Sequence, residues 1–458
     1  MGLDLVSYGR LERLIHAIGR ASRSHGISRG QVAAIYAEDP VLHAVLVLAL
    51  TRIGVVTLSA RGAFPTDFVV DVVVTDVPHT FDPAQRVVQF DPAWLEQDVA
   101  LMDAAEIDPT APDDPCRIVL TSGTTGEPRG VCFSHRQVME RVARHDTIMG
   151  SAWPGCDRCF VDLGLSTSLG FFFLIQMLIR GGMRVFRGAD AGGTMQAFGL
   201  YKVRGMFASP AALAEFVAYY EQSPGFASPF EVIVSGGSLL SPRLAERARA
   251  RLCANVVSAY GATETSMVAS APAHAIAHVP GAVGYVLPGM TVQAVDEADR
   301  PLSPGREGRL RISGQYNVDA YVGRPAEAEG AFRDGWFYPG DIGAVSADGL
   351  LVISGREKAI INLGGDKISP ERIESALAGC PGVDDVAAIG VANAAGIEEI
   401  HIAVVSTRTP DEAALAARCR AELQLAGVEL RFVRVAAIPR NDAGKIDRAR
   451  LAELVSGR

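Results

Sequence analysis

The chain has 458 residues, and its 43 Lys and Arg against 52 Asp and Glu leave a formal net charge of −9. At about 150 residues per domain this length predicts two or three domains, and an apolar share of 48% is enough for a packed core, which excludes a disordered chain. Without any block of about five Lys or Arg, the modest negative charge excludes an electrostatic surface for nucleic acid or an anionic membrane.

The N-terminal part of the sequence carries no targeting or membrane-spanning pattern. Met1–Arg20 has early charges and lacks the compact apolar stretch of a secretory signal. The longest apolar runs, Val41–Leu50 and Leu169–Ile179, hold about ten residues each, whereas a membrane-spanning helix requires about 18. The seven cysteines are scattered over a long chain, which favours free thiols over a disulfide framework. We therefore expect a cytoplasmic protein without a membrane span.

Short apolar, often β-branched runs alternate with helical patterns along the chain, which is the rhythm of an α/β fold with layered helices and strands. The strands expected are Ile118–Leu120, Met183–Phe186, Val232–Val234, Val256–Val257, Val386–Val391, Ile400–Val405 and Leu430–Val435. The helices expected are Arg136–Met149, Phe171–Ile179, Pro242–Leu252, Pro370–Ala378 and Asp411–Leu423. Ser241 and Pro242 have the residue types that cap and open a helix.

The last third of the chain changes pattern twice. From Val292 onward, short strands separated by Gly and Pro predict a β-rich subdomain. A boundary is expected near Ser354–Lys358, because the roughly one hundred residues after it alternate strands and helices again, enough for a small α+β domain. The sequence thus predicts a large N-terminal domain of residues 1–356 and a small C-terminal domain of residues 357–458.

Two spacings of metal-ligand residue types occur in the sequence. Cys156 and Cys159 form a CxxC, and His274 and His278 stand four residues apart. Neither pair has a second pair at the spacing of a zinc site, so we assign neither a metal. Whether these residues bind anything is left open here.

The densest chemical signal is Thr121–Gly130, which follows an apolar strand and holds three Gly, four hydroxyls and one Arg. Gly lets several backbone N–H groups approach one anion, hydroxyls add donors, and the guanidinium neutralises charge. The segment therefore predicts a phosphate-binding loop rather than a plain turn. Its spacing is not that of a Walker loop, and no G-x-G-x-x-G occurs anywhere in the chain. The residues assigned to phosphate are Thr121, Ser122, Gly123, Thr124, Thr125, Gly126 and Arg129.

This loop resembles the phosphate loop of the adenylate-forming enzymes, the superfamily of acyl-CoA and aryl-CoA synthetases, peptide-synthetase adenylation domains and beetle luciferases. Six further segments resemble the family's motifs in the family's order: Ser235-Gly236-Gly237, Tyr260–Thr265, Gly335–Asp341, Gly355-Arg356, Gly364–Ile368 and Pro439–Lys445. The resemblance runs from about Ala49 to Leu451. It implies a large N-terminal domain, a small mobile C-terminal domain and ATP-dependent activation of a carboxylic acid.

The resemblance also implies roles at the nucleotide. The family's equivalent of Glu264 holds Mg²⁺ against the triphosphate, a role that suits a carboxylate, since hard cations prefer oxygen ligands. The neighbouring Tyr260 and Thr263 would contact adenine and the α-phosphate, with Gly236 and Gly261 also at the nucleotide. By the same resemblance, Asp341 would accept hydrogen bonds from the ribose hydroxyls and Arg356 would contact ribose and phosphate. Taken alone, Glu264 and Asp341 are equally compatible with solvated side chains.

Three more roles follow from the resemblance to the family's C-terminal part. Lys445 would bridge the substrate carboxylate and the α-phosphate, where a cation stabilises the charge that develops during attack. Lys358 falls at the hinge between the domains, where a residue absorbs backbone rotation. Gly364 and Gly365 would border the tunnel for a pantetheine thiol, and a simple β-turn pair is the alternative.

The chain departs from the family's pattern in its phosphate loop and its acid pocket. Arg129 stands where most members have Lys, which keeps the charge and changes its geometry. Ser166 and Thr167 replace an aromatic-His pair, and Ser168 stands where amino-acid-activating members carry Asp. An amino-acid substrate is therefore disfavoured, although the nearby Asp162 keeps it open.

Two further features near this stretch have structural interpretations. Phe171, Phe172 and Phe173 are expected in the core, and His135 is interpreted as a structural imidazole. The residues of the acid pocket are expected within Leu163–Phe173, Ser235–Leu239 and Ser258–Gly261. These stretches are small or apolar, and an aryl or medium-size acyl acid fits them slightly better than an amino acid does.

The predicted function is an AMP-forming ligase that uses ATP and Mg²⁺ to convert a carboxylic acid into an acyl adenylate and then transfers the acyl group to CoA. One alternative keeps the adenylation and changes the acceptor to phosphopantetheine on a separate carrier protein or to an amine. Another, from a different class, is a nucleotide-binding protein without catalysis. The joint presence of Glu264, Arg356 and Lys445 disfavours that last alternative.

Overall fold

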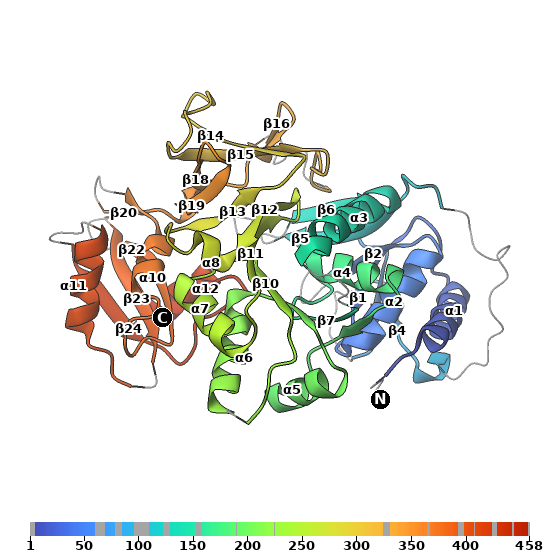
Figure 1. The fold of residues 1–458 in the computed structure, drawn as a ribbon. Coiled ribbons are helices and arrows are strands. Elements are labelled where there is room, and N and C mark those ends of the chain that lie inside the picture. Colours follow the sequence, from blue (N-terminus) through green and yellow to red (C-terminus); the bar gives the residue numbers. More distant parts are fainter. Residues whose placement is uncertain are drawn as a thin grey trace. The chain divides into compact units, whose positions relative to one another are not determined.

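The computed structural model divides into two compact units, one formed by Met1–Val203 and Val318–Glu329, the other by Arg204–Asn317 and Gly330–Arg458. The residues that the structure describes are 5–59, 69–77, 85–95, 110–121, 129–152, 157–188, 190–223, 225–323, 330–363, 367–392, 398–406, 408–423, 428–441 and 444–456. Both units combine helices and strands, so the expected α/β class is confirmed (Figure 1). The predicted boundary after Arg356 lies inside the second unit and stays a prediction.

The first unit is built on a sheet with the strand order β4-β3-β1-β2-β5-β6. Its strands are β1 (Val32–Tyr36), β2 (Val56–Ser59), β3 (Val72–Thr75), β4 (Val87–Gln89), β5 (Pro115–Thr121) and β6 (Arg129–Ser134). The first five are parallel, and β6 returns antiparallel to β5. Helix α2 (Pro40–Arg52) packs on β1 and β2 and against α1 (Tyr8–Ser24).

The rest of the first unit follows β6 along the chain. Its elements are α3 (His135–Ala152), β7 (Arg158–Val161), α4 (Ser168–Ile179), β8 (Met183–Val185) and α5 (Ala191–Leu200), with β7 and β8 parallel. Helix α4 begins at Ser168, three residues before the predicted start, because the side chain of Thr167 accepts a hydrogen bond from the backbone N–H of Gly170 and caps the helix. The three Phe residues that follow are buried, as predicted.

The second unit is built on a mixed sheet whose central strands β9 (Gly205–Ala208), β10 (Val232–Gly236) and β11 (Val256–Ala262) are parallel. Helices α6 (Pro210–Gln222) and α7 (Pro242–Arg251) follow β9 and β10, and Ser241 caps α7 as predicted. The antiparallel part begins at β12, earlier than the predicted Val292. Its strands are β12 (Ser266–Pro272), β13 (Ala282–Val286), β14 (Met290–Val295), β15 (Gly308–Gly314), β16 (Phe332–Arg333), β17 (Trp336–Phe337), β18 (Asp341–Val345) and β19 (Leu350–Arg356).

The C-terminal part of the second unit has its own three-stranded sheet with the order β22-β23-β24 (Figure 1). The elements in this part are the 3-10 turn η3 (Glu357–Ala359), β20 (Ile361–Asn362), β21 (Lys367–Ile368), α10 (Pro370–Leu377), β22 (Asp385–Ala392), β23 (Glu398–Val405), α11 (Glu412–Leu423), β24 (Leu430–Arg434) and α12 (Arg448–Ser456). Arg448 ties two of these elements together, since its guanidinium pairs with Glu371 at 2.8 Å and Glu374 at 3.0 Å, both on α10. In the part of the chain that the structure describes, no helix is both long and apolar enough to cross a membrane.

One buried histidine predicts how stability depends on pH. His145 on α3 is 1% exposed, and its ring centroid lies 6.0 Å from those of Phe172 and Phe173. Burial, with the charges of Arg141 and Arg144, lowers the pKa of His145 from 6.5 to about 3. Between pH 6.5 and pH 3, His145 is therefore protonated in the unfolded chain and neutral in the folded chain. Acidification through this range destabilises the fold. We expect about 2 kcal/mol of loss between pH 7 and pH 5, measured by denaturant unfolding.

The matching variant is His145→Phe, which keeps a ring in the aromatic cluster and removes the titrating group. Its free energy of unfolding should depend less steeply on pH between 7 and 5 than that of the unchanged chain. Equal slopes for the two proteins would show that His145 is not the group responsible.

Candidate active site

Two parallel strands end at the predicted nucleotide residues. Gly236 is the last residue of β10, and Tyr260 and Gly261 lie near the end of β11, with Gly236 paired to Ala259 in register. Ligands in parallel α/β sheets bind outside the carboxyl ends of the strands. A Cβ at Gly236 would lie 2.9 Å from the carbonyl oxygen of Ala259, so no side chain fits there. The sheet therefore presents bare backbone at this edge.

The end of β11 is distorted where the predicted metal ligand follows. The register with β12 shifts between Tyr260 and Gly261, and Ser266 has a φ of 66°, an uncommon value for a residue with a side chain. A Cβ at Gly261 would lie 2.3 Å from the carbonyl oxygen of Ser266. Between these two distortions, Glu264 is buried at 7% exposure. Bulges and strained residues of this kind redirect side chains at functional sites.

Two of the predicted nucleotide residues, Tyr260 and Arg356, contact the carboxylate of a third, Asp341. The Tyr260 hydroxyl donates a hydrogen bond to Asp341 Oδ2 at 2.5 Å, and Arg356 Nε lies 3.0 Å from Asp341 Oδ1. The antiparallel register sets Asp341 on β18 opposite Arg356 on β19, while Tyr260 arrives from β11, 81 residues earlier in the chain. Asp341 is 4% exposed. Burial, followed by the neighbouring Asp341 carboxylate, raises the pKa of Tyr260 well above 10, so its hydroxyl stays a donor.

Lys445 lies on a tight turn that packs against the start of α6. The backbone N–H of Lys445 donates to Asn441 Oδ1 at 3.0 Å, and Asn441 N–H donates to the Lys445 carbonyl at 2.9 Å. Gly444 has a φ of 72°, and a Cβ there would lie 2.6 Å from Ser209 Oγ, the cap of α6. Only Gly meets both conditions without strain. This contact fixes where the Lys445 side chain begins.

The Lys445 ammonium shares its surroundings with the same carboxylate cluster. Burial and the positive charge of Arg356 lower the pKa of Lys445 from 10.5, while the charges of Asp341 and Glu264 act in the opposite direction. The second unit thus brings two cations and two carboxylates into electrostatic contact, although they come from four separate segments. A cluster of this composition suits an anionic ligand that also carries hydroxyl groups and a divalent cation.

Glu264 fits a magnesium ligand by its chemistry. Its carboxylate supplies the hard oxygen donors that Mg²⁺ prefers, and Mg²⁺ is bound through one or two carboxylates together with substrate phosphates. The neighbouring Thr263 is partly buried and lies on the same turn.

The first unit carries the described part of the phosphate loop. Thr121 at the end of β5 pairs with Arg129 at the start of β6, and its hydroxyl donates to the Arg129 carbonyl at 3.3 Å. The Arg129 guanidinium lies over the Tyr321 ring, 5.2 Å from its centroid. The remaining predicted phosphate residues, Ser122, Gly123, Thr124, Thr125 and Gly126, lie outside the described residues.

The stretch predicted to receive the acid connects β7 to α4. We call Leu163–Gly170 the acid loop. Asp162, just before it, pairs with Arg187 at 2.7 Å, so its carboxylate already has a cationic partner. Thr167 is the cap of α4 and Ser168 is its first residue. The carboxylate that kept an amino-acid substrate open is therefore ion-paired, and the choice against amino acids stays a prediction.

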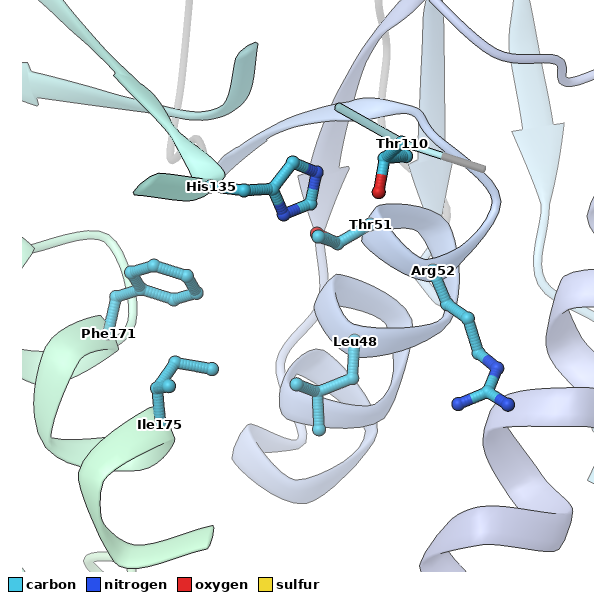
Figure 2. A pocket seen from close by; sticks show the side chains of 7 residues that line it. All are labelled: Leu48, Thr51, Arg52, Thr110, His135, Phe171 and Ile175. Carbon is cyan, nitrogen blue, oxygen red and sulfur yellow. The ribbon is translucent and has the colours of Figure 1, made fainter. Parts of the chain in front are cut away.

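A pocket of about 320 Å³ opens beside α4 within the first unit (Figure 2). Phe171 and Ile175 form one wall and face Leu48 and Thr51 on α2, and Arg52 lies at the end of the same helix. Thr110 and His135 complete the lining. Burial lowers the pKa of His135 below 6.5, so the imidazole is neutral at pH 7.

The remaining residues singled out in the sequence are described in part or lie outside the described residues. Lys358 lies in η3, directly after β19, and only its backbone is described. Gly364, Gly365 and Cys156 lie outside the described residues, and His274 and His278 are exposed.

Sequence reasoning missed one buried arginine, one half-buried arginine and one serine. Arg117 and Arg184 each interrupt an apolar strand, which was the available signal, and Ser209 precedes Pro210 at a helix start.

Comparison with known proteins identifies similar enzymes over almost the whole chain. Residues 4–322 match the family described as AMP-binding enzyme, and residues 372–445 match the AMP-binding enzyme C-terminal domain. The chain is 26% identical over 473 residues to the 4-chlorobenzoate–CoA ligase of an Arthrobacter species, with 98% of this chain and 90% of that protein covered. It is 30% identical over 362 residues to the fatty acid–[acyl-carrier-protein] ligase ScoC of Streptomyces coeruleorubidus, with 75% and 68% covered.

A solved structure agrees with these matches. ATP-bound MatB from Rhodopseudomonas palustris has a TM-score of 0.80 at 26% identity, with 98% of this chain and 93% of that chain covered. The expected fold class, a large α/β part followed by a smaller C-terminal part, is confirmed.

Proposed function

Because the chain belongs to the family of AMP-binding enzymes, we propose that it activates a carboxylic acid with ATP and passes the acyl group to a thiol. A carboxylate is a poor electrophile, because its leaving group would be oxide. Attack of a carboxylate oxygen on the α-phosphorus of ATP forms the mixed anhydride and expels pyrophosphate. The thiol then attacks the acyl carbon and releases AMP.

Each residue of the site has a task in the first step. Asp341 accepts hydrogen bonds from the ribose hydroxyls, and Arg356 and Tyr260 hold its carboxylate in place. Thr121, Arg129 and the loop between them bind the phosphates that leave. Glu264 holds Mg²⁺, which neutralises phosphate charge when bound. Lys445 stabilises the charge that grows between the attacking carboxylate and the α-phosphate, so positioning and electrostatics supply most of the acceleration.

The observation that carries this proposal is the cluster around Asp341, which Tyr260 and Arg356 contact at 2.5 Å and 3.0 Å, with the Lys445 ammonium near enough to feel the charge of Asp341. Glu264 lies on the turn after β11, Asp341 is the first residue of β18, Arg356 is the last of β19, and Lys445 lies on the C-terminal turn. Arg356 is engaged by the Asp341 carboxylate, which leaves the Lys445 ammonium as the cation for the charge that develops in the reaction. This favours catalysis over the non-catalytic alternative.

The thiol acceptor is CoA in this proposal, and phosphopantetheine on a separate carrier protein or an amine is the alternative. Gly364 and Gly365 border the thiol's path, and Lys358 is the pivot about which residues 357–458 rotate between the two steps. We also propose a cytoplasmic location, since seven cysteines scattered over a long chain suit a reducing compartment better than a disulfide framework.

Acid-dependent exchange of labelled pyrophosphate into ATP tests the adenylation step directly. A panel of aryl and medium-size acyl acids should include at least one that supports exchange and is trapped by hydroxylamine. Mass spectrometry of the products with CoA, a carrier protein or an amine then identifies the acceptor. Absence of exchange and of AMP release across the panel would favour a nucleotide-binding protein without catalysis.

The same site predicts an alkaline limit to the adenylation rate. Lys445 must be protonated to stabilise the transition state, and burial next to Arg356 lowers its pKa from 10.5. The rate should therefore fall, as the pH rises, at values below 10.5. Pyrophosphate exchange measured from pH 7 to 10 checks this, with enzyme stability followed in parallel. A rate that stays constant up to pH 10 in folded enzyme would contradict the assignment.

A further inference from the structure

Two arginines that the proposed mechanism does not use donate hydrogen bonds to the backbone of the acid loop. Arg117, on β5, is 0% exposed. One of its terminal nitrogens donates to the carbonyl of Leu165 at 2.5 Å and to Ser59 Oγ at 2.5 Å. The other donates to Thr57 Oγ1 at 3.3 Å. The guanidinium also lies 5.1 Å from the centroid of the Phe171 ring.

Arg184, on β8, holds both ends of the same loop. Its two terminal nitrogens donate to the carbonyl of Gly170 and, at 3.0 Å, to the carbonyl of Leu163. The guanidinium lies 4.7 Å from the centroid of the Phe186 ring. Two strands therefore supply three hydrogen bonds to backbone carbonyls of one eight-residue segment.

Neither guanidinium pairs with a carboxylate in the part of the chain that the structure describes. Burial lowers the pKa of each arginine to about 9, so both remain cationic at pH 7. Burying a cation without an ion pair costs free energy, and an apolar side chain of similar volume would occupy the space at less cost. What only a guanidinium provides here is a rigid fork of donors directed at several acceptors.

The acid loop is also held by contacts within its own backbone. A Cβ at Gly170 would lie 2.0 Å from the carbonyl oxygen of Gly164, so the two ends of the loop touch through backbone. The N–H of Thr167 donates to the Gly164 carbonyl at 3.0 Å, and the N–H of Phe171 donates to the Thr167 carbonyl at 3.1 Å. The loop begins at the carboxyl end of β7, the edge where parallel sheets bind ligands.

We propose that Arg117 and Arg184 are positioning residues for the acid substrate, fixing the carbonyl groups of the acid loop so that the loop presents one shape to the acid. The identity of the bound molecule rests on the proposed function, whereas the immobilisation of the loop rests on the contacts above. Neither arginine touches the substrate.

The test compares Arg117→Met and Arg184→Met with Arg180→Met as the matched control. Arg180 follows α4 and is ion-paired with Asp146 rather than with the acid loop. Methionine keeps most of the side-chain volume and removes every donor. Arg117→Lys and Arg184→Lys keep the charge with fewer, less rigid donors, and they replace a Met variant that does not fold.

Two readouts are needed. The first is the KM for the acid against the KM for ATP, in pyrophosphate exchange. We expect the KM for the acid to rise about tenfold or more in the Met variants, with the KM for ATP changed less than about twofold, because small displacements of positioning groups are costly. The Lys variants should lie between, and Arg180→Met should match the unchanged enzyme.

The second readout needs no substrate. Amide hydrogen exchange of the peptide covering the acid loop should become faster in the Met variants and stay unchanged in Arg180→Met. Folded Arg117 and Arg184 variants with unchanged exchange in this peptide would overturn the proposal, as would equal changes in both KM values. If no acid supports pyrophosphate exchange in the unchanged enzyme, the proposed function fails, and hydrogen exchange alone decides whether the arginines position the loop.

Discussion

Lys445→Ala should lower kcat for adenylation by about 10²–10³-fold, which corresponds to about 3–4 kcal/mol of lost transition-state stabilisation. The ammonium is partly buried beside Glu264, Asp341 and Arg356, where a charge is worth more than in water. Most of the effect should fall on kcat, because the negative charge between the carboxylate and the α-phosphate is larger in the transition state than in the bound substrates. Single-turnover formation of the adenylate measures it.

A control and a second assay separate this role from a structural one. The control is Arg450→Ala. Arg450 stands five residues after Lys445, is 74% exposed and lies 3.6 Å from the Asp447 carboxylate. This variant should leave adenylation unchanged. Thioester formation from a supplied acyl adenylate should continue in Lys445→Ala, because that step breaks no bond at phosphorus. Full adenylation by folded Lys445→Ala would remove Lys445 from the mechanism.

Asp341→Ala should raise the KM for ATP by about 10²-fold, since the carboxylate would make two charge-assisted hydrogen bonds to ribose, together worth about 3 kcal/mol. The substitution also leaves Arg356 and the Tyr260 hydroxyl without the acceptor that they share. The KM for the acid should change much less. Initial rates of pyrophosphate exchange at varied ATP, together with the dissociation constant for ATP, give both quantities.

Two further variants sharpen the comparison. Asp348→Asn alters a carboxylate in the turn of the same hairpin, where it accepts a hydrogen bond from the Ser346 hydroxyl, and should leave the KM for ATP unchanged. Tyr260→Phe keeps the ring and removes one hydrogen bond to Asp341, so we expect a smaller rise of about tenfold. An unaltered KM for ATP in folded Asp341→Ala would show that the ribose is bound elsewhere.

Periodicity was enough to predict the α/β layers, whereas the roles of the site residues came from the resemblance to the adenylate-forming enzymes and stay predictions. The strand at Val232 and the helix at Pro242 follow from local apolar runs and a Ser-Pro cap, which depend on neighbours in the sequence. The start of α4 was predicted three residues late, because an apolar run marks the buried face of a helix and the cap at Thr167 precedes that face.

The contacts between distant segments could not be predicted from the sequence. Tyr260 and Asp341 meet because β11 and β18 belong to one sheet. The sequence motifs that contain these residues do not specify the order of the strands in that sheet. The same holds for Arg117 and Arg184. A charged residue inside an apolar strand signals a buried polar contact, but its acceptors at Leu163, Leu165 and Gly170 come from a loop of another segment.

The position of Arg356 at the very end of β19 bears on how the reaction intermediate survives. Arg356 contacts Asp341 within the sheet, and the proposed pivot at Lys358 comes only two residues later. Rotation beyond Lys358 would carry Lys445 away and leave the grip on the ribose intact. The acyl adenylate, which water hydrolyses, would then stay bound through its AMP half while residues 357–458 rotate between the adenylation step and the thiol-transfer step.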